Sequence, residues 1–184
     1  MSTTALQAKA DQFRVALSEI ESNRRLWYDE IKPLLVTVLT RITQETALVA
    51  EVQQLDDTLN NEGVNLAFST APSGMRSNPE SFLNQITEGG QTHRMYVKQG
   101  GYIVFAQSYN GLIVVLIGYP HIEEKVTQAP SKLLGKFNPR DITESFIEGK
   151  VGEFFDEMIR WERESSDTTR LGFLLSGQQL KKPV

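Results

Sequence analysis

The side chains best suited to chemistry near neutral pH are two histidines, His93 and His121, because imidazole changes charge in that range. His121 is followed closely by Glu123 and Glu124, so an imidazole and two carboxylates could together offer metal ligands. Their spacing matches no helical pair of ligands, however, and Pro120 favours a loop at this point. We therefore interpret this stretch as an exposed polar turn and expect neither a metal ion nor a cofactor.

Neither a catalytic nucleophile nor a phosphate-binding loop stands out. The chain has no cysteine, which excludes thiolate nucleophiles, disulfides and cysteine-bound metal clusters. The pattern G-x-S-x-G, typical of many serine hydrolases, is absent. Gly74 and Arg76 precede a predicted helix, where an anion could bind, but the lysine of a nucleotide-binding loop is missing. We assign no catalytic residue, and the sequence favours a protein that is not an enzyme.

The distribution of charge argues against a nucleic-acid partner. The net charge is −4 and the pI is near 5.3, whereas binding to a phosphate backbone needs a concentrated basic face. Residues 1–62 carry six basic and ten acidic groups, and residues 136–164 carry five and eight. The tail is net positive, but its Lys181–Lys182 pair is too small for a polybasic membrane anchor.

A membrane partner is not expected either. The longest apolar run, Leu112–Ile117, has six residues, far short of the roughly 20 that cross a bilayer as a helix. The N-terminal residues mix acids and bases and hold no apolar core of the signal-peptide type. We expect a cytoplasmic location, with which the lack of cysteine is compatible.

Residues 4–61 are predicted to be helical almost throughout. Apolar residues recur at heptad spacing along the first half of this segment. Such a seam is typical either of a helix packed on its own domain or of one that pairs with another subunit. Pro33 lies within the pattern, where it either kinks one long helix or begins a second one. If the seam joins subunits, the self-association residues are Leu6, Phe13, Leu17, Ile20, Trp27 and Ile31.

An antiparallel sheet of about four strands is predicted to follow. One strand covers residues 64–70, and a meander over residues 92–98, 102–108 and 112–119 supplies the others. Asn110–Gly111 is typical of a two-residue hairpin turn, which sets Val104 opposite Ile117. A second turn at Gly100–Gly101 joins the first two strands of the meander. One face is then entirely apolar and holds Met95, Val97, Val104, Ala106, Val115 and Ile117.

The opposite face of this predicted sheet is mixed in character. It becomes more apolar toward the run Leu112–Ile117, which we interpret as a central strand buried on both sides. Its more polar part is a candidate pocket for a small apolar or amphipathic ligand. The candidate ligand-binding residues are Arg94, Tyr96, Lys98, Phe105 and Gln107.

A strong helix is predicted from about residue 141 to residue 164, with one continuous apolar face. Gly149 and Gly152 each weaken a helix by about 1 kcal/mol relative to alanine, so we expect close packing at these two positions. A short helix over residues 79–87 is also expected, and residues 165–184 form a polar tail.

These elements predict an α+β fold, in which long N-terminal helices and a C-terminal helix pack on an antiparallel β-meander. Residues 1–62 form the helical N-terminal segment, and residues 63–164 hold the sheet and the C-terminal helix in one domain. We expect a non-enzymatic protein that forms a homo-oligomer or binds a protein partner through its N-terminal helix. The alternative is a module that binds a small apolar or amphipathic ligand over the face with Arg94, Tyr96 and Phe105.

Overall fold

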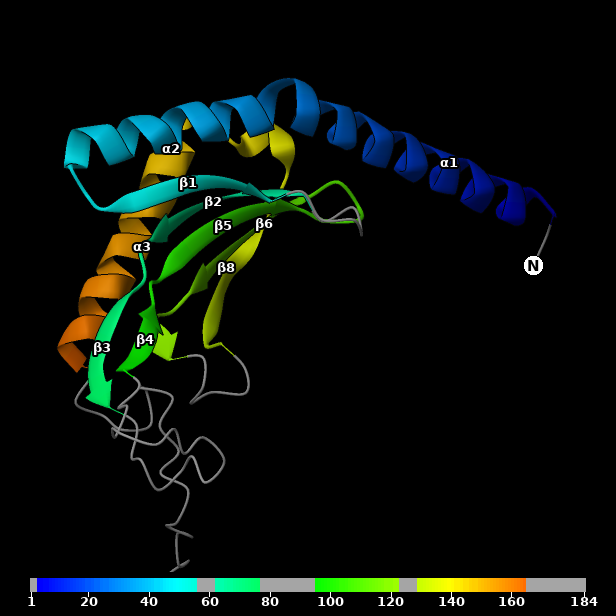
Figure 1. Cartoon of the computed structure of the whole chain (residues 1–184). Helices are drawn as coiled ribbons and strands as arrows, with labels where there is room; N and C mark the ends of the chain where they lie inside the picture. Colours follow the sequence, from blue (N-terminus) through cyan, green and yellow to red (C-terminus); the bar gives the residue numbers. More distant parts are fainter. Residues whose placement is uncertain (1–2, 56–61, 77–94, 123–128, 165–184) are drawn as a thin grey trace, which may run out of the picture.

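The computed structural model describes residues 3–55, 62–76, 95–122 and 129–164 (Figure 1). In this described part an N-terminal and a C-terminal helix pack on an antiparallel sheet, so the predicted α+β class is confirmed. The predicted helix over residues 79–87, the side chains of His93 and Arg94, and the tail from residue 165 lie outside the described residues.

One long helix forms the N-terminal part of the chain. It comprises α1 (Thr3–Leu26), the π-helical turn η1 (Trp27–Ile31) and α2 (Lys32–Thr46). The backbone N–H of Lys32 donates to the carbonyl oxygen of Trp27, five residues earlier, immediately before Pro33, which has no N–H to donate. The helix therefore continues through Pro33 by widening for one turn. Figure 1 shows α2 lying along the sheet and α1 projecting beyond it.

The prediction of helix up to residue 61 is wrong. α2 ends at Thr46, Ala47 adopts a left-handed conformation with φ of 51°, and strand β1 (Ala50–Leu55) follows. Apolar residues three positions apart in this segment imitate a helical period. Within β1, however, Val52 is half-buried and its neighbour Glu51 is exposed, which is the two-residue alternation of a strand.

Five antiparallel strands form the main sheet, in the order β1-β2-β5-β6-β8. After β1 come β2 (Gly63–Phe68), β5 (Tyr102–Gln107), β6 (Ile113–Gly118) and β8 (Ser131–Phe137). A smaller sheet, in the order β3-β4-β7, consists of β3 (Ala71–Arg76), β4 (Met95–Gln99) and β7 (His121–Ile122).

The predicted hairpin between β4 and β5 is wrong, because β5 pairs with β2 and β4 belongs to the smaller sheet. A Cβ atom on Gly100 would lie 2.1 Å from the carbonyl oxygen of Phe68, and one on Gly101 would lie 2.2 Å from Sδ of Met158. The two glycines are therefore required by close packing where the chain passes between the sheets, and not by a tight turn.

The register between β5 and β6 differs by one residue from the prediction. Val104 pairs with Leu116, because the hairpin has a three-residue turn. The N–H of Ser108 donates to the carbonyl oxygen of Leu112 at 2.8 Å, and Gly111 has φ of 77°. A type I turn followed by a left-handed glycine has this form, whereas the Asn–Gly pair had predicted a two-residue turn.

A one-residue shift exchanges the two faces of a sheet, so the predicted apolar face does not exist as a unit. The face that packs against the helices holds Ile103, Phe105, Ile113, Val115 and Ile117, all fully buried. α2 and α3 (Glu144–Glu164) cover this face with Leu35, Leu39, Ile147, Val151 and Phe154, among others. We call the opposite side of the main sheet the outer face. There Val104, Ala106, Val114 and Leu116 are only half-buried, so β6 is fully buried on one side rather than on both.

α3 begins after the 3-10 turn η4 (Pro139–Asp141). Its N-terminus is capped by Thr143, whose Oγ1 accepts a hydrogen bond from the N–H of Phe146 at 3.2 Å. Gly149 and Gly152 lie on its exposed side, and a Cβ atom at either position would meet no described atom within 4 Å. The expectation that these glycines mark close packing is therefore wrong.

Candidate functional site

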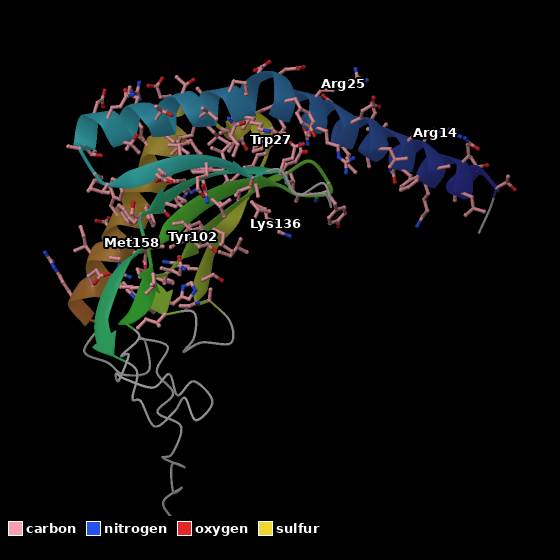
Figure 2. All side chains as sticks on the ribbon, viewed as in Figure 1. Arg14, Arg25, Trp27, Tyr102, Lys136 and Met158 are labelled. Carbon is pink, nitrogen blue, oxygen red and sulfur yellow. The ribbon has the colours of Figure 1, made fainter. Side chains whose placement is uncertain are left out.

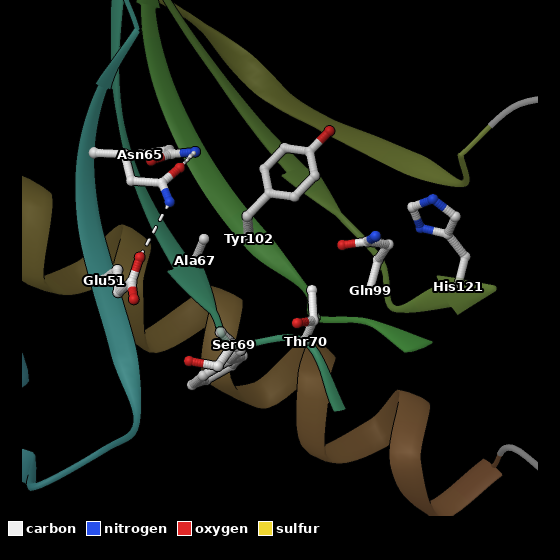
Figure 3. A pocket seen from close by; sticks show the side chains of 11 residues that line it. Glu51, Asn65, Ala67, Ser69, Thr70, Gln99, Tyr102 and His121 are labelled. Atoms are coloured by element: carbon white, nitrogen blue, oxygen red, sulfur yellow. Dashed lines mark hydrogen bonds between the residues drawn. The ribbon is translucent and has the colours of Figure 1, made fainter. Parts of the chain in front are cut away.

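The outer face is hollowed where β1, β2 and β5 approach the smaller sheet (Figure 3). We call this hollow, with a volume of about 420 Å³, the outer-face pocket. Most of its side chains are polar, and they come from five strands and the segments that link them. The lining residues are Glu51, Gln53, Asn65, Ala67, Phe68, Ser69, Thr70, Gln99, Gly100, Tyr102 and His121.

The strand register brings the central pocket residues together in two rows. Gln53 pairs with Asn65 in one row, and Ala67 pairs with both Glu51 and Tyr102 in the other. Side chains alternate between the faces of a strand, and these five all lie on the outer face. The small methyl group of Ala67 leaves space open between the Glu51 carboxylate and the Tyr102 ring.

Asn65 is the most buried polar residue of the pocket, with 8% of its surface exposed. Its Nδ2 donates to Oε1 of Gln53 at 3.5 Å, and Nε2 of Gln53 donates to Oε2 of Glu51 at 3.3 Å. Figure 3 shows these three side chains as a connected series. The Oδ1 atom of Asn65 has no hydrogen-bond partner among the described residues, and a buried oxygen in that state is costly and uncommon.

Tyr102 lies flat on the sheet. Its partner on β6 is Gly118, and a Cβ atom at Gly118 would lie between 2.2 and 2.8 Å from three carbons of the tyrosine ring. Glycine at this position therefore makes room for the ring, as it does where an aromatic side chain covers a glycine in a sheet. One side of the ring rests on β6, and the residue also lines the pocket.

His121 reaches the pocket from the smaller sheet, where it pairs with Gln99. Its Nδ1 lies 3.1 Å from the carbonyl oxygen of Tyr119. Because a carbonyl oxygen only accepts, Nδ1 carries the proton of the neutral ring and Nε2 is left as an acceptor. Among the described residues no hydroxyl group is hydrogen-bonded to this imidazole, so the pocket holds no paired nucleophile and base there.

Among the described residues, one carboxylate carries the charge of the outer-face pocket. Glu51 is the only Asp, Glu, Lys or Arg residue in the part of its lining that the structure describes. Within the described part of the chain, Glu51 makes no ion pair and its recorded contact is the hydrogen bond from Gln53. The pocket therefore repels anions and offers uncharged hydrogen-bonding groups.

The residues predicted to bind a ligand are not brought together. Phe105 is 0% exposed and Gln107 is 6% exposed, and both lie on the helix-facing side of β5. Lys98 lies in the smaller sheet, where its Nζ is 2.5 Å from Oε1 of Glu162 on α3. The backbone of Tyr96 also belongs to that sheet. The predicted pocket depended on a hairpin between β4 and β5 that does not form.

The sequence did carry one signal for the outer-face pocket. Asn65 is the single polar residue within the stretch Gly63–Phe68, and a polar residue inside an apolar strand requires an explanation. Its neighbours in the pocket could not be inferred, because they depend on which strands pair.

The residues predicted for self-association fall into two groups. Trp27 and Ile31 are 0% and 4% exposed and belong to the core of their own domain. Leu6, Phe13 and Leu17 are 54%, 64% and 49% exposed on α1. The C-terminal end of the predicted seam therefore packs in the core of its own domain, and the N-terminal end is exposed to solvent (Figures 1 and 2).

The boundary between the two groups lies at Ile20, which is half-buried. The turn between β5 and β6 supports the helix at this level, since a Cβ atom at Gly111 would lie 2.7 Å from Cβ of Asn23. Arg24 adds a hydrogen bond from Nη2 to the carbonyl oxygen of Tyr109 at 2.7 Å. Every residue of α1 from position 3 to position 19 is exposed.

A carboxylate fixes the helix to the sheet below this boundary. Glu62, just before β2, accepts hydrogen bonds from Nε1 of Trp27 at 3.3 Å, from the hydroxyl of Tyr28 at 2.7 Å and from Nζ of Lys32 at 3.4 Å. Burial alone would raise the pKa of Glu62, but these three donors together lower it below its ordinary value. The hydrogen bond that the Tyr28 hydroxyl donates to Glu62 raises the pKa of Tyr28.

A second carboxylate joins α3 to the other end of the sheet. Glu157 is 9% exposed and accepts hydrogen bonds from Lys132 at 2.8 Å, Tyr119 at 2.7 Å and Arg160 at 2.9 Å. The hydrogen bond from Lys132, followed by that from Tyr119, lowers the pKa of Glu157. Glu62 and Glu157 thus each accept hydrogen bonds from three side chains, and these bonds join the helices to the sheet.

Comparison of the chain with models of protein families, with curated proteins and with solved structures finds no match. Searched over the described residues, the structure shows no cluster of three or more potential metal ligands. No helix in those residues is both long enough and apolar enough to cross a membrane. The outer-face pocket and α1 are therefore the candidate functional features of the described residues.

Proposed function

We propose that this chain is a non-enzymatic protein of the cytoplasm that self-associates through α1. The observation that carries the proposal is the row of Leu6, Phe13 and Leu17, about half or more exposed on a helix that projects from its own domain. An isolated helix gains most of its stability when its apolar face is packed against another element.

The projecting helix has little else to stabilise it. No residue of α1 is buried, and its first turn holds no acidic residue to complement the helix dipole. Exposed ion pairs, such as Arg14–Asp11 at 2.6 Å and Arg25–Glu21, contribute only a few tenths of a kcal/mol each. A second helix along the apolar row would supply the missing packing.

The sizes of the seam residues favour an antiparallel pair of α1 helices from two copies. Aligned over residues 6–17, such a pair sets Leu6 opposite Leu17 and Ala10 opposite Phe13 at both ends. A small residue then faces a large one, as close packing requires. A parallel pair would instead set Phe13 against Phe13 and Ala10 against Ala10, leaving one layer crowded and the next one empty.

Charges beside the seam favour the same direction. In a parallel pair, Lys9 of one copy lies beside Arg14 of the other, which is a like-charge contact. In the antiparallel pair, Arg14 lies beside Gln7 and Lys9 lies beside Ala16, so that no like charges meet. The antiparallel pair also places the two domains at opposite ends, away from each other.

The expected dimer is weak. Covering one half-exposed Leu or Phe side chain contributes about 1–1.5 kcal/mol, so the three large residues on each copy supply about 6–9 kcal/mol in total. Association costs about 4–15 kcal/mol. At the lower end of this cost, the balance of about 5 kcal/mol corresponds to a dissociation constant of about 0.2 mM, so the dimer should depend strongly on concentration.

A matched pair of variants on α1 tests the proposal. Phe13→Asp places a charge in the seam and should leave the protein monomeric up to about 1 mM, well above the expected dissociation constant. Val15→Asp adds the same charge at a residue that is 59% exposed and lies off the seam, and should retain the dimer. Light scattering at high concentration measures both molar masses. Equal masses for the two variants would contradict a role for the seam, and capture of a different protein by α1 would replace self-association with partner binding.

A further inference from the structure

We propose that the outer-face pocket binds a neutral, polyhydroxylated ligand such as a sugar or a polyol. In this site the Tyr102 ring is the platform, and Asn65, Glu51 and Gln99 provide hydrogen bonds to hydroxyl groups. The proposal concerns a surface separate from α1 and does not depend on self-association.

The unpartnered oxygen of Asn65 is the first argument. An asparagine that is 8% exposed, on a sheet face with Val104 beside it, needs a partner for Oδ1 and has none among the described residues. Replacing it with an apolar residue of similar size would remove an unsatisfied group and favour folding. A polar side chain that lowers stability and lines a pocket is typical of a residue that binds a ligand.

The orientation of the amide is the second argument. The Asn65 side chain has little room to rotate, because the residue is 8% exposed and its Nδ2 donates to Oε1 of Gln53 at 3.5 Å. The Oδ1 atom is thus fixed before a ligand arrives, which reduces the entropy that binding must cost. A ligand hydroxyl can donate to Oδ1, and a neighbouring hydroxyl can donate to the Glu51 carboxylate.

Tyr102 supplies the third argument. Its ring is held flat by Gly118, so the face turned away from β6 is available as a plane. The electron-rich face of an aromatic ring attracts positively polarised hydrogens, and the C–H bonds of a sugar ring present several in one plane. Amide and carboxylate groups around an aromatic plane match a molecule with an apolar face and a rim of hydroxyls.

Charge and size narrow the class of ligand. Among the described residues the lining includes no Lys or Arg, so Glu51 would repel phosphorylated or carboxylated ligands without compensation from that part of the wall. The volume of about 420 Å³ lies within the range of about 300–1,000 Å³ that is common for small-molecule sites. Cleavage of a glycosidic bond requires two carboxyl groups, whereas one carboxylate lines the pocket in the described part, so the site would bind and not hydrolyse.

The test is a titration of the full-length, ¹⁵N-labelled chain with glucose, N-acetylglucosamine, maltose and myo-inositol. Each probe is added to about 10 mM, which nearly saturates a site of millimolar affinity. The side-chain amide signals of Asn65 and Gln99 should shift with at least one probe. Inorganic phosphate and choline serve as the anionic and cationic controls. Failure of all four polyols to shift these signals, or shifts with choline alone, overturns the proposal.

Three variants decide which residues bind. Asn65→Leu should weaken the binding probe about tenfold or more while the Tm stays equal or rises. Glu51→Ala removes an acceptor for a ligand hydroxyl and should weaken the binding probe about threefold or more. Leu133→Asn, on an exposed residue of β8, should leave both affinity and shifts unaltered. Binding that survives Asn65→Leu, or a large loss with Leu133→Asn, would show that the probe binds elsewhere.

Discussion

At the scale of single residues, this protein contains residues that selection for stability alone would not favour. Among the described residues, the buried Oδ1 of Asn65 has no partner, and no atom lies close enough to Gly149 and Gly152, on the exposed side of α3, to require glycine there. Gly111 is different, because its φ of 77° and the proximity of Asn23 both exclude a side chain. The same residue type is therefore essential at one position and replaceable at two others.

Alanine substitutions at these glycines should change stability in opposite directions. Gly149→Ala and Gly152→Ala should each raise the free energy of unfolding by about 0.5–1 kcal/mol, because alanine is the better helix former. Gly111→Ala should lower it by about 1–3 kcal/mol, because a Cβ atom would be strained and would crowd the N-terminal helix. Urea denaturation at low protein concentration measures all three. A destabilising effect at Gly149 would mean that an unseen contact covers α3.

Single-residue signals also show where prediction from sequence stops. Asn65 could be flagged in its apolar strand, but Tyr102, Glu51 and His121 join it only through strand pairings distant in the sequence. The predicted ligand-binding residues are not brought together for a similar reason, because they depended on pairing between β4 and β5, whereas β4 belongs to the smaller sheet. A site built across strands can be predicted only once the pairing is known.

At the scale of elements, hydrogen-bonded carboxylates fix the two helices to the sheet. Glu62 holds the π-helical turn and the start of α2, and Glu157 holds α3. Because both pKa values are lowered in the folded protein, each carboxylate stabilises the fold above the ordinary glutamate pKa of about 4.3 and loses this effect as the pH falls through the lowered folded value.

Glu62→Gln should therefore lower the free energy of unfolding at pH 7 by about 1–3 kcal/mol. The difference between the variant and the wild type should shrink as the pH is lowered toward 3, because the wild-type carboxylate gains a proton as the pH falls through its lowered folded pKa. Urea denaturation at both pH values measures this. Glu153→Gln, at an exposed ion pair with Lys150, is the control and should change stability by less than about 0.5 kcal/mol. A difference that persists unchanged at low pH would mean that packing and not charge is responsible.

Elements with a strong period of their own were predictable, and those that depend on distant partners were not. The heptad seam of the first helix and the apolar face of α3 were both recognised. The six residues of β1 were not, because a half-buried edge strand with apolar residues three apart imitates a helix. The predicted register between β5 and β6 was wrong by one residue because Asn110–Gly111 suits either a two-residue or a three-residue turn. Only the packing of Gly111 under α1 distinguishes these two turns.

The direction of helix pairing can be tested by cross-linking, since the chain has no cysteine of its own. An equimolar mixture of Leu6→Cys and Leu17→Cys should give disulfide-linked heterodimers on mild oxidation, because the antiparallel pair sets these positions opposite each other. Each variant alone should cross-link far less. Efficient homodimers of Leu6→Cys alone would instead indicate a parallel pair.

At the scale of the whole molecule, the chain combines a compact α+β body with a helix that extends outside it (Figure 1). The body has its own core, which includes Trp27 and Ile31 from the same heptad seam. The projecting part contributes no buried residue to that core. The two parts therefore suit the two proposed tasks, which are ligand binding in the outer-face pocket of the body and self-association through α1.

The most direct measurement of this division is sedimentation equilibrium of the full chain and of a chain lacking residues 1–18, each from about 10 μM to 1 mM. These concentrations bracket the expected dissociation constant of about 0.2 mM. The full chain should change from monomer to dimer across the series, and the shortened chain should stay monomeric with an unchanged urea midpoint, because the removed residues that the structure describes are all exposed. A full chain that is monomeric at every concentration, or a shortened chain that still dimerises, would contradict self-association through α1.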